Sequence, residues 1–211
     1  NPEIHKKFLI ENKKLKFMRK ALLSGQFEGM GKGDPDLYKG FCWRFTDLTN
    51  SNGFIGVVLP RSAFNSDGST EFRKKTIKEN SKIILTFLLN NKQWVFNDVH
   101  PQETIALFNL QKNPKKENNT MQLFKTISNY ENFINLKNSD SRTFSISDIN
   151  KWNLYYSIPT IPNADSITVF SKMAKFKKIA EFENNSKIRF HRELDATNDR
   201  SLILTDEKYK N

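Results

Sequence analysis

The stretch KIILTFLLNNKQWVFNDVHPQETIALFNLQ, residues 82–111, decides how this chain folds. Its two apolar runs, Ile83–Leu89 and Thr104–Leu110, have the length and the side chains of buried strands. No helical periodicity lies between them, so we predict that they are antiparallel neighbours in a sheet. The polar segment that joins them carries three side chains able to stack or to hydrogen-bond, namely Trp94, Phe96 and His100.

Upstream of this stretch, helix and strand signals alternate, which predicts an α/β fold with helices on the faces of a mixed sheet. Helices are expected over residues 1–24, 34–48 and 70–79, the second starting at the Asp34–Pro35 cap signal. The first has a lysine-rich face that is either solvated or in contact with a nucleic-acid backbone. Gly53–Leu59 is uninterruptedly apolar, which predicts a parallel strand buried on both faces.

A polar segment at residues 113–119, NPKKENN, interrupts this pattern and predicts a boundary. We therefore divide the chain into residues 1–112 and a smaller, irregular α+β segment, residues 113–211. The expected elements of that segment are a short capped helix, an extended piece and a basic helix, at Ser147–Trp152, Ile158–Pro162 and Asp165–Phe182.

Charge narrows the class of partner. The chain has 34 Lys and Arg against 23 Asp and Glu, a formal net charge of +11. This excess favours a polyanionic partner, nucleic acid before an anionic membrane, while the alternative is a solvated basic surface. No apolar run reaches the ~18 residues of a membrane span, and no signal peptide is visible.

Motifs that carry chemistry by themselves are missing from the sequence. Cys42, the single cysteine, is predicted to be a core residue, and a chain without a disulfide fits a reducing cytoplasm. The histidines do not pair with Cys42 or with carboxylates at a metal-ligand spacing. The glycines of residues 25–33 lack the preceding strand and the Lys-Ser/Thr pair of a phosphate cradle, so a flexible loop is expected.

Four segments occur in the order seen in adenine-specific DNA methyltransferases: DLYKGFCWRFTDL, NGFIGVVLPRSAF, STEFRKKTI and VFNDVHPQETIALFNL. The similarity is greatest to the fused restriction–modification enzymes of type IIG. The residues that match the family pattern are Leu37, Tyr38, Phe41, Pro60, Arg73, Val95, Phe96, Val99 and His100. The late stretch FHRELDATNDRSLI, residues 190–203, resembles the lead-in to the target-recognition region of that family.

The resemblance implies a parent enzyme that moves a methyl group from S-adenosylmethionine to the amino group of a flipped adenine in double-stranded DNA. The cofactor loop and the Asn/Asp-Pro-Pro-aromatic loop of the family have no match, since Asn1-Pro2-Glu3 lacks the second proline and the aromatic. The resemblance therefore implies the C-terminal half of a Rossmann-like methyltransferase sheet, with no catalytic, cofactor-binding or metal-binding residue. Alone, this chain is expected to be inactive and to depend on the remainder of the parent polypeptide.

By this resemblance Phe96 takes the base-stacking position, with a core residue as the alternative and Trp94 as a nearby substitute. Arg61 and His100 are further candidates for DNA contact, and a structural role is the alternative for His100. Arg73 either pairs with a carboxylate inside the fold or contacts a phosphate. Two rival functions remain open: a non-catalytic basic DNA-binding module, and a basic structural domain that does not bind nucleic acid.

Overall fold

The computed structural model describes residues 1–27, 29–31, 35–79, 82–112, 119–137, 141–152, 155–173, 175–177 and 199–200. Two units share the chain, Asn1–Met173 and Ala174–Asn211, and all elements named below belong to the first. The helices are α1 (Pro2–Leu22), α2 (Leu37–Leu48), α3 (Ser62–Asn65), α4 (Thr70–Glu79), α5 (Tyr130–Ile134), α6 (Ile146–Trp152) and α7 (Ala164–Met173). Two short 3-10 helices are η1 (Asp67–Ser69) and η2 (Asn91–Gln93). The strands are β1 (Phe54–Pro60), β2 (Lys82–Leu89), β3 (Thr104–Gln111), β4 (Thr120–Phe124) and β5 (Ser141–Ser145).

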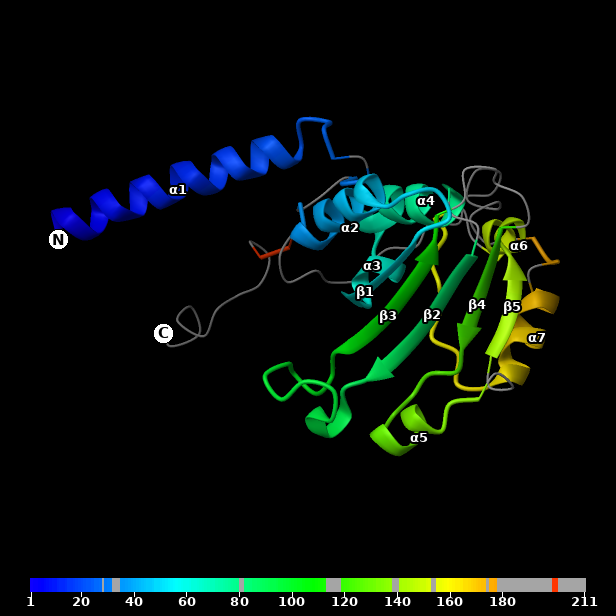
Figure 1. Ribbon diagram of the computed structural model, residues 1–211. Coiled ribbons are helices and arrows are strands. Elements are labelled where there is room, and N and C mark those ends of the chain that lie inside the picture. Colours follow the sequence, from blue (N-terminus) through cyan, green and yellow to red (C-terminus); the bar gives the residue numbers. More distant parts are fainter. Residues whose placement is uncertain are drawn as a thin grey trace. The chain divides into compact units, whose positions relative to one another are not determined.

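The five strands form one mixed sheet in the order β1-β3-β2-β4-β5. β3 is antiparallel to both β1 and β2, β2 is parallel to β4, and β4 is antiparallel to β5. The carboxyl ends of β1, β2 and β4 therefore share one edge, and the arrowheads of β2 and β4 point to it in Figure 1. The α/β fold and the antiparallel pairing of the two strands in residues 82–111 are confirmed.

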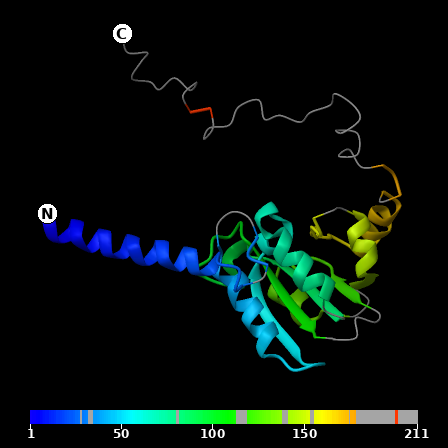
Figure 2. The same cartoon turned by 90° about the horizontal axis from the view of Figure 1, so that it is seen from above.

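The main core lies on one face of the sheet. The strand register places the buried side chains Ile55, Leu85, Phe108 and Met121 of four neighbouring strands on the same face. Buried residues of α2, α3, α4 and α6 belong to the same apolar cluster. Figure 2 shows α2 and α4 alongside the strands. Because strand side chains alternate between faces, the opposite face keeps a smaller apolar cluster, which lies near the end of β2.

The prediction for the strand at residues 53–59 is wrong in two respects. β1 is an edge strand that pairs with an antiparallel neighbour, and only one of its faces is covered. Ile55 and Leu59 are buried, whereas Phe54 and Val58 are 76% and 55% exposed. Both faces of this strand are apolar in sequence, but the helices of the described chain pack against only one of them.

Two helix predictions need adjustment at one end. α2 begins at Leu37 with Asp36 as its N-cap, so the predicted start is two to three residues early, and Asp34 itself lies outside the described residues. α7 ends at Met173, and the predicted continuation beyond residue 177 also lies outside them. α1 forms as expected but buries no residue. No helix in the described part of the chain combines the length and the apolar character of a membrane span.

The segment that follows residue 112 adds two strands to the sheet. β4 pairs with β2, and β5 pairs with β4, through backbone ladders that no local pattern of the sequence indicated. The boundary placed between residues 112 and 113 thus falls between two strands of one sheet. The division of the chain into two domains at this point stays a prediction.

Candidate functional site

The candidate site lies at the sheet edge where β1, β2 and β4 end. Arg61 follows β1, Asn90 follows β2 and Lys125 follows β4. In α/β sheets the loops outside the carboxyl ends of parallel strands are the usual place for a ligand. The segment that connects β2 to β3 crosses this edge, near α5 in Figure 1, and contains all but one of the predicted site residues.

Phe96 lies on the surface of this connecting segment. Its side chain is 44% exposed, so it does not belong to the core that the described residues form. Its backbone, in contrast, is held from inside the protein: the N–H donates to Asn90 Oδ1 at 3.1 Å, and the carbonyl accepts from Asn90 Nδ2 at 3.1 Å. The segment therefore presents an aromatic ring on an ordered backbone, and the stacking of a base on this ring stays a prediction.

Asn90 is the residue that sequence reasoning missed. It is fully buried and its backbone N–H donates to the Glu103 carbonyl at 3.1 Å, which closes the segment between the two strands. Besides the Phe96 bonds, its Nδ2 donates to the Val99 carbonyl at 2.9 Å and its Oδ1 accepts from the Val95 N–H at 3.1 Å. The only signal in the sequence is an asparagine directly after an apolar strand, which is common at any turn.

Trp94, the alternative stacking residue, is half-buried and has internal partners, and its contact with DNA stays a prediction. Its indole Nε1 donates to the Leu89 carbonyl at 2.6 Å, and its ring lies 6.4 Å from the Phe133 ring, centroid to centroid. The ring packs against the apolar cluster of Leu88 and Ile105 on the second face of the sheet. Trp94 therefore fastens the connecting segment to the sheet.

His100 is exposed and shapes the return of the segment into β3. Its Nδ1 accepts from the Gln102 N–H at 3.3 Å, and its carbonyl accepts from the Glu103 N–H at 2.9 Å. With Nδ1 as an acceptor, the neutral ring carries its proton on Nε2 and keeps a donor for a further partner. Both roles considered for His100, a structural one and a hydrogen bond to DNA, are compatible with this geometry.

Arg61 lies at the same edge but is already engaged. Its Nη1 donates to Thr160 Oγ1 at 3.0 Å, and its guanidinium lies 5.8 Å from the centre of the Phe87 ring. Burial lowers the pKa of this guanidinium from its usual value. Contact of Arg61 with DNA, which stays a prediction, would have to share the guanidinium with Thr160 or displace that bond.

Arg73 has an internal role. It is fully buried, and its guanidinium donates to the carbonyls of Tyr155 at 2.9 Å, Ser66 at 2.8 Å and Ala63 at 3.2 Å. Burial lowers the pKa of this group too. Arg73 makes neither the carboxylate pair nor the phosphate contact considered from the sequence. Its guanidinium donates to backbone carbonyls instead. Arg73 thus ties residue 155 to the turn between α3 and α4.

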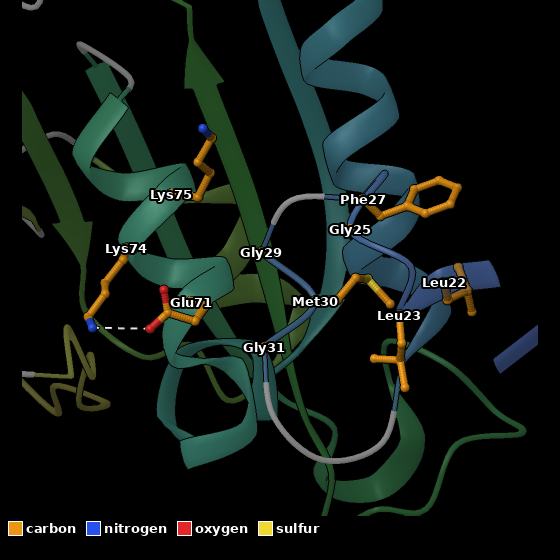
Figure 3. Close-up of a pocket in the computed structure, with 10 residues that line it drawn as sticks. All are labelled: Leu22, Leu23, Gly25, Phe27, Gly29, Met30, Gly31, Glu71, Lys74 and Lys75. Carbon is orange, nitrogen blue, oxygen red and sulfur yellow. Dashed lines mark hydrogen bonds and ion pairs between the residues drawn. The ribbon is translucent and has the colours of Figure 1, made fainter. Parts of the chain in front are cut away.

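A hollow of about 490 Å³ lies between α4 and the segment that follows α1, away from the carboxyl edge residues described above (Figure 3). Gly31 has a φ of +69°, and a Cβ atom there would lie 2.8 Å from the Gly68 carbonyl oxygen. Lys74, on the rim, pairs with Glu71 at 3.1 Å. The glycines of this segment allow its backbone to pack against η1 and α4. Within the described ranges, no three His, Cys, Asp or Glu side chains gather as ligands for a metal ion.

Comparison with known proteins gives partial likenesses of fold. No protein-family model matches the chain, and no curated protein sequence matches it. A DrdV–DNA complex is 19% identical over 52% of this chain and 12% of its own, with a TM-score of 0.42. The ATP-dependent type ISP restriction–modification enzyme LlaBIII bound to DNA is 14% identical over 60% of this chain and 10% of its own, with a TM-score of 0.42.

A third solved structure, the type I restriction–modification methyltransferase subunit from Streptococcus thermophilus, is 17% identical over 67% of this chain, with a TM-score of 0.45. The chain spans 33% of that subunit and a smaller share of the other two structures. At these identities the likeness concerns the fold alone.

Proposed function

We propose that this chain is part of a restriction–modification DNA adenine methyltransferase of the type IIG kind, and that its sheet edge forms one wall of a pocket for a flipped adenine. One feature of the sequence and one of the structure support this function. Four sequence segments resemble the methyltransferase family in the right order. The aromatic residue that the resemblance assigns to base stacking, Phe96, is exposed at the carboxyl edge of the sheet.

The exposure of Phe96 on a held backbone is the observation that carries the proposal. Methylation of an adenine inside duplex DNA requires the base to leave the helix, at a cost of a few kcal/mol. An aromatic face returns roughly 1–3 kcal/mol by stacking on the extruded base. Because the Phe96 backbone is hydrogen-bonded to buried Asn90, the backbone that carries the ring does not have to be ordered when the base arrives.

The cofactor belongs to another part of the proposed parent. The segment between α1 and α2 is not a good candidate for the S-adenosylmethionine site, because two of its glycines, Gly29 and Gly31, are used for close packing against α4 and η1. We therefore place the cofactor and the catalytic loop in the remainder of the parent polypeptide, and we expect the 211-residue chain to transfer no methyl group by itself. The proposed setting is the bacterial cytoplasm, with double-stranded DNA as the substrate.

Replacing Phe96 by alanine tests the function. In the full-length protein, Phe96→Ala should lower kcat/KM for DNA methylation by about tenfold or more, the loss expected for one stacking contact. Duplex binding should change much less, because phosphate contacts dominate it. The measurements are transfer of labelled methyl groups, identification of the methylated base by mass spectrometry, and duplex affinity at a fixed salt concentration.

Phe54→Ala is the matched control, since Phe54 is also an exposed phenylalanine but stands at the start of β1, away from the carboxyl edge. Equal methylation by the Phe96 and Phe54 variants would remove Phe96 from the pocket. Duplex binding by the full-length protein with no methyl transfer would instead identify a non-catalytic DNA-binding module, the class that the net charge of +11 favours.

A further inference from the structure

A buried asparagine amide reaches its full hydrogen-bonding capacity beneath the candidate site. The Asn90 side chain is fully buried, its Oδ1 accepts two backbone N–H groups, and its Nδ2 donates to two backbone carbonyls. An amide has two donors and two acceptor lone pairs, so no capacity remains. Only one orientation of the amide satisfies two N–H groups and two carbonyls together.

Two of these four bonds go to the same residue. Phe96 is held through both its N–H and its carbonyl, while Val95 and Val99 take one bond each. Two neighbouring features also restrict the segment: Lys92 and Gln93 have φ values of +60° and +56°, a conformation that residues other than glycine rarely adopt. A backbone held in this manner is specified by tertiary contacts and not by local preference.

We propose, on the basis of the function proposed above, that Asn90 is the positioning residue for Phe96. Its amide fixes the backbone of Phe96, so that the exposed ring extends from one fixed place on the sheet edge when it meets an extruded base. An unfixed segment would have to be ordered on binding, and the loss of backbone conformational entropy would weaken binding. Asn90 touches neither DNA nor cofactor in this role and acts only through the ring that it holds.

Backbone amide hydrogen exchange in the full-length protein tests the hydrogen bonds of Asn90 directly. In the unmodified protein the Phe96 N–H, bonded to a buried oxygen, should exchange about tenfold or more slowly than the N–H of exposed Asn97. Asn90→Ala should accelerate exchange at Val95 and Phe96 by about tenfold or more. Asn90→Asp keeps the shape but turns a carboxylate oxygen toward two carbonyls, and it should have the same effect. Asn91→Ala, an exposed neighbour in η2, is the control and should leave exchange unchanged.

A double-mutant cycle separates positioning from general loss of structure. If Asn90 acts through Phe96, adding Asn90→Ala to Phe96→Ala should lower kcat/KM for methylation little beyond Phe96→Ala alone. Additive losses, or fast exchange of the Phe96 N–H in the unmodified protein, would overturn the role of Asn90 while leaving the proposed function intact. Unchanged methylation by Phe96→Ala alone would instead overturn the proposed function, and the positioning role with it.

Discussion

Lys39 and Arg73 are basic residues whose side chains serve the interior. Lys39 is 1% exposed, and its Nζ donates to the carbonyls of Gly68 at 2.9 Å and Met30 at 3.3 Å. Arg73 is fully buried and donates to three other carbonyls. Burial of a polar side chain costs free energy unless acceptors replace water, and backbone carbonyls do so at both positions. Lys39 Nζ also lies 3.7 Å from Asp36 Oδ2. Lys39 and Arg73 count toward the net charge of +11, but both are buried and do not lie on the surface that a partner would contact.

Cys42 gives a prediction at this scale. Burial raises the pKa of its thiol to about 12, so the thiol stays protonated near neutral pH. We expect alkylation of the native chain by iodoacetamide at pH 8 to be at least about a hundredfold slower than alkylation of the denatured chain, in which the pKa is about 8.5. Mass spectrometry of the single labelled cysteine measures both rates. A native rate equal to the denatured rate would show that Cys42 is accessible.

The same shift sets a pH dependence for stability. The folded state binds this proton more tightly than the unfolded state, so the contribution of Cys42 is full below about pH 8.5. It should be lost progressively as the pH rises from there toward the folded-state pKa of about 12. The free energy of unfolding, measured by denaturant titration across this range, should fall less steeply in Cys42→Ala.

At the scale of elements, helices and strands were predicted correctly where the spacing of apolar residues matches the pattern of burial. α4 occupies residues 70–79 as predicted, and its inward residues Phe72 and Ile77 are 3% and 1% exposed. Both strands of residues 82–111 also form within one residue of their predicted ends. β1 departed from prediction because a strand whose faces are both apolar gives no sign of which face helices will cover.

The segment between α1 and α2 packs against η1 through Gly31, and a substitution there tests this packing. Gly31→Ala should lower the free energy of unfolding by about 2–4 kcal/mol, since it combines a positive φ with a Cβ atom 2.8 Å from the Gly68 carbonyl oxygen. Gly25→Ala is the matched control, because Gly25 also has a positive φ but has open space around it. The control should cost only about 1–2 kcal/mol. Equal losses in the two variants would contradict the packing role of Gly31.

At the scale of the whole molecule, the sheet order joins distant segments into one site. β3 lies between β1 and β2, so the start of β3 meets the ends of both strands. Arg61 and Asn90 thereby stand at one edge, and the Arg61 N–H donates to the Thr104 carbonyl at 3.0 Å. Strand pairing therefore brings Arg61 to the segment between β2 and β3, which carries the other residues of the site.

Salt dependence tests the nucleic-acid function of the whole chain. With a net charge of +11, duplex affinity should fall steeply between about 50 and 200 mM salt, with about 0.9 counterion released for each phosphate contact. Fluorescence anisotropy with a labelled duplex measures the slope, and competition with polyglutamate separates DNA binding from attraction to any polyanion. A flat slope would leave a basic structural domain as the remaining class.

The amino-acid sequence by itself determined the elements whose pattern is local: the two strands of residues 82–111, their antiparallel pairing, α4, and the burial of Cys42. Phe96 was identified as a candidate site residue through the resemblance to adenine-specific DNA methyltransferases, and not from composition. Only the tertiary structure decided which face of β1 is covered, that β4 and β5 extend the sheet, and that Trp94, Arg61 and Arg73 are held by internal partners. The reason is physical. The periodicity of apolar residues indicates which side chains will be buried. The hydrogen-bond partners of a side chain such as Asn90 belong to segments that meet only when the sheet has formed.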